Sequence, residues 1–215
     1  FFLKLIMLSE ILELISRSFV FYFVVIDPLG TVAIFLTLIP RIKDNKYKIA
    51  FESTILAFLV LVFFFIMGKS ILNHLNISLY SFKIAGGIIL LLIAVEMLLD
   101  KRSARKEKSL QDKNIITSVF PLAIPLLAGP AAITSVIVSS SNISSTGSIF
   151  YTIAHITSLF FVLLITCVLF FIIIKSEKFI SKKILLVFSR IIAIILTALS
   201  IQFILDGLKE AINSF

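Results

Sequence analysis

The sequence has no tryptophan, one cysteine and two histidines among its 215 residues. The single cysteine, Cys167, excludes a disulfide framework within one chain, and the two histidines are too far apart in sequence to form a zinc-binding motif. The chain also lacks a phosphate-binding glycine loop and a recognisable nucleophile with a partnered base. We therefore expect no enzymatic activity and no resident metal or organic cofactor.

Charged residues are scarce as well. They make up 15% of the chain, whereas hydrophobic residues make up 60%, and the mean hydropathy is +1.15. This composition excludes an ordinary soluble domain and indicates an integral membrane protein, with membrane lipids as partners. The net charge of +8 comes from basic residues in short segments between apolar runs. Because they form no basic stripe with interleaved aromatics, nucleic-acid binding is not predicted.

The apolar residues form six runs, each long enough to cross a bilayer as a helix. The predicted fold is therefore an all-α polytopic membrane protein with one span in each run. Three spans per half is an odd number, so repeated halves have to be inserted in opposite directions. We predict two inverted three-helix repeats, at 1–99 and 115–215, joined by a basic cytoplasmic connection at 100–114. The six runs are 11–39, 48–68, 77–99, 115–140, 148–174 and 184–208.

The distribution of basic residues predicts the orientation of the chain. Fourteen of the 20 lysine and arginine residues lie in the connections between spans one and two, three and four, and five and six. The positive-inside rule places these connections in the cytoplasm, so both termini are predicted on the outer, periplasmic side of a bacterial inner membrane. The fourteen residues are Arg41, Lys43, Lys46, Lys48, Lys101, Arg102, Arg105, Lys106, Lys108, Lys113, Lys175, Lys178, Lys182 and Lys183.

An acid, a proline and a glycine interrupt the first apolar run at its centre, in the segment Ile26–Gly30. Proline removes a backbone donor and disfavours helical angles at the residue before it, so the first half-helix is expected to end near Ile26 or Asp27. Asp27 is a favoured N-cap residue and Pro28 a favoured first helical residue. A second half-helix is therefore predicted to begin at mid-membrane depth, where its N–H groups and its dipole attract anions.

The segment Pro121–Pro130 interrupts the fourth run in a similar way. Pro125 breaks the helix, and Gly129 followed by Pro130 can open a new half-helix. Interrupted spans in corresponding halves of a membrane protein are the best indication in a sequence of a transporter binding site at the bilayer midplane. The two breaks therefore predict such a site.

Several candidate site residues also have a simpler structural explanation. A carboxylate at Asp27 is costly unless it caps a helix, pairs or faces water, so a capping role and a role in binding an ion, a proton or a solute both stay open. Packing is the commoner reason for a small residue such as Gly30 in a membrane helix. Thr134 and Ser135 can bind a solute one turn after the second break, but bonds to their own helix are more common. His155 is either a proton site or, more commonly, a satisfied buried histidine.

Four segments together resemble the MarC-like family of bacterial six-helix inner-membrane proteins. The resemblance covers nearly the whole chain, and the segment in span four is its most specific part. Two positions depart mildly from the family pattern, since arginine is common at the position of Lys83 and proline at that of Ala33. The resemblance implies a six-span plasma-membrane protein related to transporters of small neutral amino acids that are coupled to cations. The four segments are Asp27–Gly30, Lys83–Gly87, Pro121–Pro130 and Gln202–Gly207.

The leading hypothesis is a cation-coupled carrier for a small zwitterionic solute such as glycine, alanine or serine. Backbone donors at Gly30 and Ala131 would hold the solute carboxylate. Asp27 and unwound carbonyls around Ala128 and Gly129 would hold the ammonium group or the coupling ion, either a proton or sodium. Rocking of one half against the other would give alternating access.

The alternative hypothesis is a non-transporting membrane protein with a structural, lipid-related or regulatory role, in which the breaks only shape the packing. A hydrated cavity shared by Asp27 and both half-helix starts favours the carrier, whereas a cavity filled by Phe side chains favours the alternative. The sequence leaves open the solute, the direction of transport, the coupling ion and the oligomeric state.

Overall fold

A computed structural model describes residues 2–42, 45–99, 101, 122–146, 149–176 and 181–214. Within these ranges the regular structure is helical, without a strand, which confirms the predicted all-α class. Five helical segments are long and apolar enough to cross a membrane. The predicted fourth span contributes a shorter apolar helix over Pro130–Ser141, and the first part of that span, 115–121, lies outside the described residues. The five candidate spans are Ile11–Leu38, Lys46–His74, Leu79–Leu98, Ile149–Lys175 and Lys182–Asn213.

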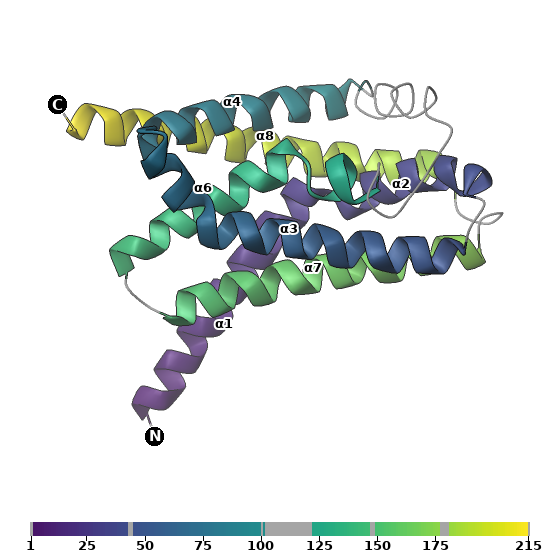
Figure 1. Ribbon diagram of the computed structural model, residues 1–215, viewed down its shortest axis with the longest axis horizontal. Coiled ribbons are helices and arrows are strands. Elements are labelled where there is room, and N and C mark those ends of the chain that lie inside the picture. The colour runs from purple at the N-terminus through teal and green to yellow at the C-terminus, as the bar shows by residue number, and fades with distance from the viewer. Residues whose placement is uncertain are drawn as a thin grey trace.

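The first candidate span is built from two helices, α1 and α2, which meet at Asp27. A short helical turn, η1, follows α2, and a second short segment, η2, precedes α6. Figure 1 shows the arrangement of the helices. Their bounds are α1 Phe2–Ile26, α2 Pro28–Leu38, η1 Ile39–Arg41, α3 Lys46–His74, α4 Leu79–Leu98, η2 Leu122–Leu127, α6 Pro130–Thr146, α7 Ile149–Lys175 and α8 Lys182–Asn213.

Side-chain caps fix the starts of two long helices. Asn45 precedes α3, and its side-chain oxygen accepts hydrogen bonds from the backbone N–H groups of Tyr47 and Lys48. Ser78 precedes α4, and its hydroxyl oxygen accepts from the backbone N–H of Ser81. Such caps satisfy donors that a helix cannot satisfy internally. Both helices therefore begin within a few residues of the predicted span starts.

The helices run between two ends of an elongated bundle (Figure 1). The N-terminus, the C-terminus and the turn from α3 to α4 lie toward one end, while the start of α3, the end of α4 and the start of α8 lie at the other. The end of α7 also lies there, so the described helix ends at Lys46, Lys175 and Lys182 share this second end. The helix ends therefore gather at two opposite ends of the bundle, as is expected for membrane spans. The assignment of the second end to the cytoplasm stays a prediction.

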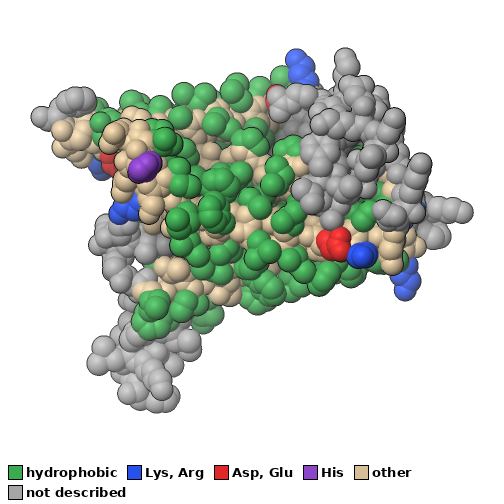
Figure 2. Space-filling model, viewed as in Figure 1, with side chains coloured by type: hydrophobic (Ala, Val, Ile, Leu, Met, Phe, Trp, Pro, Cys, Tyr) green, Lys and Arg blue, Asp and Glu red, His purple; other side chains and the backbone are tan. Residues whose placement is uncertain are grey.

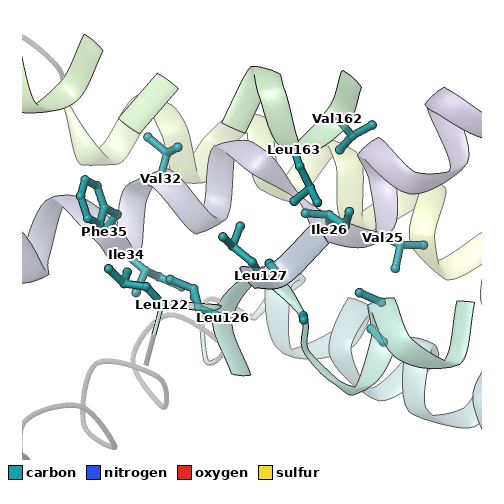
Figure 3. Packing of buried hydrophobic residues seen from close by; sticks show 14 of the residues in the cluster. Val25, Ile26, Val32, Ile34, Phe35, Leu122, Leu126, Leu127, Val162 and Leu163 are labelled. Atoms are coloured by element: carbon teal, nitrogen blue, oxygen red, sulfur yellow. The ribbon is translucent and has the colours of Figure 1, made fainter. Parts of the chain in front are cut away.

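A buried apolar cluster surrounds the two interrupted spans. Figure 3 shows Ile26 at the end of α1, Leu127 at the end of η2 and Leu163 of α7 within this cluster. Phe35 of α2 is fully buried, and its ring centroid lies 4.3 Å from that of Phe170 in α7. The breaks are therefore held in place by packing on several sides, with the second half-helix α2 enclosed by α7, α8 and η2.

The outside of the bundle is also apolar. Figure 2 shows hydrophobic side chains over the middle of one face, with the described charged side chains toward its two ends. Residues on α3, α7 and α8 such as Phe63, Phe161 and Ile194 are exposed. An apolar exterior is what a bilayer requires, because lipid tails cannot hydrogen-bond to polar groups. The surface therefore agrees with the membrane location inferred from the composition.

Helices α4 and α8 lie side by side and run in opposite directions (Figure 1). They approach each other closely at Gly87 of α4, where an added methyl group would lie 2.8 Å from the backbone oxygen of Ser200 and 3.0 Å from the backbone nitrogen of Ile204. Small residues allow membrane helices to approach this closely, and van der Waals packing then holds them together. Gly87 is therefore a helix-contact position.

Candidate functional site

The first break centres on Asp27, which lies between α1 and α2. Its backbone is left-handed, with φ 51° and ψ 69°, and its side-chain Oδ1 accepts a hydrogen bond of 3.1 Å from the backbone N–H of Gly30. Pro28 follows as the first residue of α2. The geometry is that of an N-cap with proline at the first helical position, as the sequence predicts. The carboxylate also places a negative charge at the positive end of the α2 dipole, which stabilises it.

The second carboxylate oxygen of Asp27 joins the break to α8. The Ser189 hydroxyl donates a hydrogen bond of 2.6 Å to Asp27 Oδ2, and both side chains are buried. This partner lies 162 residues away in the chain, and serine hydroxyls in helices usually bond to their own backbone. The sequence therefore contained no local signal that identified Ser189.

Gly30 is in contact with this pair. A methyl group added there would lie 2.0 Å from Asp27 Oδ2 and 2.6 Å from Ser189 Oγ. Both distances are shorter than any normal contact, so the side chains of Asp27 and Ser189 can take these positions only because residue 30 has no side chain. In this structure the N–H of Gly30 is used by the cap, and its predicted contact with a solute carboxylate stays a prediction.

Replacing Gly30 by alanine is expected to displace the Asp27 carboxylate from its cap and from Ser189. Overpacking of a buried site typically costs about 1–3 kcal/mol, and the loss of an N-cap adds about 1 kcal/mol. We expect a lower free energy of unfolding in lipid–detergent micelles. Equal stability of Gly30→Ala and the parent protein would contradict the close contact.

The second break lies between η2 and α6. The backbone is non-helical at Ile124 and Pro125, and α6 begins at Pro130. The carbonyl of Gly129 accepts a 3.0 Å hydrogen bond from the N–H of Ile133, so Gly129 occupies the N-cap position. The structure thus places Pro125, Gly129 and Pro130 at the break, where the sequence puts them.

The two half-helix starts differ in charge. At α2 the cap residue is Asp27 with its own carboxylate, whereas at α6 the cap position holds Gly129, which has no side chain. Ala131 and Ser135 are four residues apart and so share a face of α6. Both are buried, and the Ser135 hydroxyl has no hydrogen-bond partner among the described residues. The start of α6 is therefore the better candidate for binding an anionic group from a ligand.

The other predicted site residues pack near the second break. Ala128 is buried in the apolar cluster together with Ile26 and Ala131. The methyl group of Thr134 lies against Gly86 of α4, which gives this side chain a packing role; its predicted contact with a solute stays a prediction. The cluster brings the end of α1 and the start of α6 into one region of the bundle (Figure 3).

A second polar cluster lies between α1 and α7. The two ring nitrogens of His155 face hydroxyl groups of α1, with Nδ1 3.0 Å from the Tyr22 hydroxyl and Nε2 3.4 Å from Ser18 Oγ. Ser139 of α6 approaches the Tyr22 hydroxyl. The sequence singles out His155 but not its partners. Ser18 and Tyr22 are four residues apart on one helix face, which is the signal that was available.

No group of three His, Cys, Asp or Glu side chains that could hold a metal ion occurs in the part of the chain that the structure describes. The segment Gln202–Gly207 contributes an exposed polar pair, since the Gln202 side-chain amide donates a 2.8 Å hydrogen bond to Asp206 Oδ1 on α8.

Comparison with known proteins agrees with the membrane character of the bundle. A family model described as MarC family integral membrane protein matches residues 12–212. A UPF0056 membrane protein of Archaeoglobus fulgidus is 33% identical over 215 residues, covering 94% of this chain and 96% of its own length. A UPF0056 membrane protein of Aquifex aeolicus is 28% identical over 217 residues, covering 96% of this chain and 97% of its own. These names specify membrane proteins and no substrate. No solved structure matches the chain.

Proposed function

The chain belongs to the MarC family of integral membrane proteins, and from this premise we propose that it is a secondary transporter of a small zwitterionic solute such as glycine, alanine or serine, coupled to a cation. The observation that carries the proposal is the contrast between the two half-helix starts. One holds a buried carboxylate, Asp27, and the other has a bare glycine cap followed by a buried serine hydroxyl that has no partner among the residues the structure describes. A solute with one positive and one negative group suits this pair.

The negative group of the solute is assigned to the start of α6. The first N–H groups of a helix have no internal partner, and the helix dipole adds a partial positive charge there. Ala131 supplies such a donor, and the Ser135 hydroxyl lies one turn further along the same face. Together they offer hydrogen bonds to a carboxylate. The start of α2 is a poorer anion site, because Asp27 already neutralises it.

The positive group or the coupling cation is assigned to the region of Asp27. Asp27 is 2% exposed, and a buried ionisable residue within a membrane span is a functional-site hypothesis by default. The same carboxylate caps α2 and accepts a hydrogen bond from Ser189, and we assign it the additional role of attracting the cation. Unwound backbone around Ala128 and Gly129 adds carbonyl oxygens, which suit an ammonium group or a sodium ion.

The proposal includes a six-span bundle of two inverted repeats with both termini outside the cytoplasm. Helices α1 and α2 run along the bundle in one direction, and η2 and α6 run in the other (Figure 1). Two interrupted segments of opposite direction support an inverted relation between 1–99 and 115–215. The connection predicted at 100–114 lies outside the described residues.

Uptake of labelled glycine, alanine and serine into liposomes that contain the purified protein tests the function. We expect uptake driven by an inward proton or sodium gradient. Asp27→Asn is the informative variant, because asparagine is an equally good N-cap but carries no charge. It is expected to keep the fold and to lose gradient-driven accumulation.

The controls separate folding from transport. Ser189→Ala removes a hydrogen bond to Asp27 without removing the charge, and we expect it to retain gradient-driven uptake at a reduced rate. Absence of uptake of all three solutes by folded, correctly inserted parent protein would reject this substrate class. Full gradient-driven uptake by Asp27→Asn would remove Asp27 from the coupling mechanism.

A specific observation also favours a non-transporting role. The region between the two breaks contains the apolar side chains of Ile26 and Leu127, both buried in the main cluster, and the cap alone is sufficient to explain Asp27. In that role the breaks set the packing of α2 and α6 and no solute binds. Loss of stability in Asp27→Ala together with no solute-induced stabilisation of the parent protein would support it.

A further inference from the structure

The polar cluster around His155 is not used by the proposed solute site. It lies in the half of the bundle that holds the N-terminus, where α1 and α7 pack against each other (Figure 1). His155 is 7% exposed, and Ser18 and Tyr22 are also buried. The Ser158 hydroxyl donates a further hydrogen bond of 2.9 Å to the carbonyl of Ile15, so polar contacts join the two helices over more than one turn.

The groups that face the imidazole ring are mainly neutral hydroxyls and aromatic rings. Tyr22 comes from α1 and Phe65 from α3, with Tyr151 one turn away on α7. Helices α2 and α6 carry no charged residue within their bounds. Outside the cluster, Arg17 of α1 is exposed and pairs with Glu13, and Lys69 of α3 is exposed. Among the described residues in contact with the His155 ring, the titratable groups are therefore Tyr22 and Tyr151, and none is a carboxylate.

The neutral and the charged form of histidine differ in how well they fit this environment. A neutral ring has one donor and one acceptor nitrogen, and the two hydroxyls can satisfy both because each can donate or accept. A charged ring has two donors and is costly to enclose without an opposite charge. Protonation therefore favours any state in which α1 and α7 separate and water reaches the ring.

We propose that His155 is a proton-binding latch between α1 and α7. The neutral ring holds the two helices together through Tyr22 and Ser18, and a proton taken up from the adjoining solution releases them at this end of the bundle. When α1 and α7 close again, the ring returns the proton to the same solution. The latch regulates access to the transport site and so rests on the proposed function for its biological purpose, although its opening needs no solute.

The separation of α1 and α7 can be measured directly. Spin labels at Leu12 and Ile153, which are exposed on the two helices, are attached to cysteines in a Cys167→Ala background, and their distance distribution is recorded in lipid nanodiscs from about pH 5 to about pH 8. We expect acid to move the distribution toward longer distances. One bound proton can change the ratio of open to closed protein by at most about tenfold per pH unit.

Three variants complete the test. His155→Gln is expected to abolish the pH dependence, and Tyr22→Phe, which removes one hydrogen bond to the ring, is expected to raise the open fraction at neutral pH. His74→Gln replaces the other of the two histidines and should behave like the parent protein. A distribution that does not change with pH, or one that changes equally in His155→Gln, would overturn the latch. Because no solute is present, the result is independent of whether the protein transports the solutes proposed above.

Discussion

Replacing Gly87 by leucine is expected to force α4 and α8 apart and to prevent accumulation of folded protein in the membrane. The added side chain would meet the backbone of Ser200 and Ile204, which cannot move aside as a flexible side-chain end can. Overpacking in a closely packed core costs about 1–3 kcal/mol when neighbours can adjust, and more when they cannot. The measurement is the yield of monodisperse protein after extraction and its free energy of unfolding.

Ala85→Leu is the matched control for this change. Ala85 lies two residues earlier on α4 and is exposed, so the same side chain is added to the same helix on the side that faces lipid. It should leave yield and stability close to those of the parent protein. Similar yields from Gly87→Leu and Ala85→Leu would show that the contact between α4 and α8 is not as close as the structure has it.

Replacing Asp27 by leucine is expected to have the second large effect. The substitution leaves the N–H of Gly30 and the hydroxyl of Ser189 without their acceptor inside an apolar bundle. An unsatisfied buried polar group costs about 1–3 kcal/mol, and the two together give an expected loss of about 2–6 kcal/mol. The left-handed backbone of Asp27 increases the loss, because a leucine side chain is disfavoured at positive φ.

A graded series of variants identifies the cause of this loss. Asp27→Asn restores an acceptor for Gly30 and tolerates positive φ, so it should recover most of the stability. Ser189→Ala removes both the donor and its need for a partner, so we expect a loss of about 1 kcal/mol. If Asp27→Asn were as unstable as Asp27→Leu, the negative charge and not the hydrogen-bonded cap would be the stabilising feature.

The proposed site and the proposed latch lie at successive levels of α1. Tyr22 is five residues before Asp27, so the latch lies about 7–8 Å along the helix axis from the break. A separation of α1 from α7 at His155 would loosen the bundle about one and a half helical turns before the break. In the proposed carrier, alternating access would involve movement of α1, with the hydrogen bond between Ser189 and Asp27 keeping α2 attached to α8.

The sequence by itself determined the all-α class, most of the span boundaries and the positions of both breaks. These features depend on local chemistry, since the length of an apolar run, the missing donor of Pro28 and Pro130 and the capping preference of Asp27 act within a few residues. These features do not depend on contacts with distant parts of the chain.

The tertiary structure decided which residues meet. Ser189 bonds to Asp27 and His155 bonds to Tyr22 because helices distant in sequence pack together, and a serine or tyrosine in an apolar run has no local feature that reveals its partner. Packing also decided which polar groups near the two half-helix starts are buried. Asp27 neutralises the start of α2, while Gly129 leaves the start of α6 without a charge and Ser135 is buried beside it, a difference that depends on burial as well as on residue type.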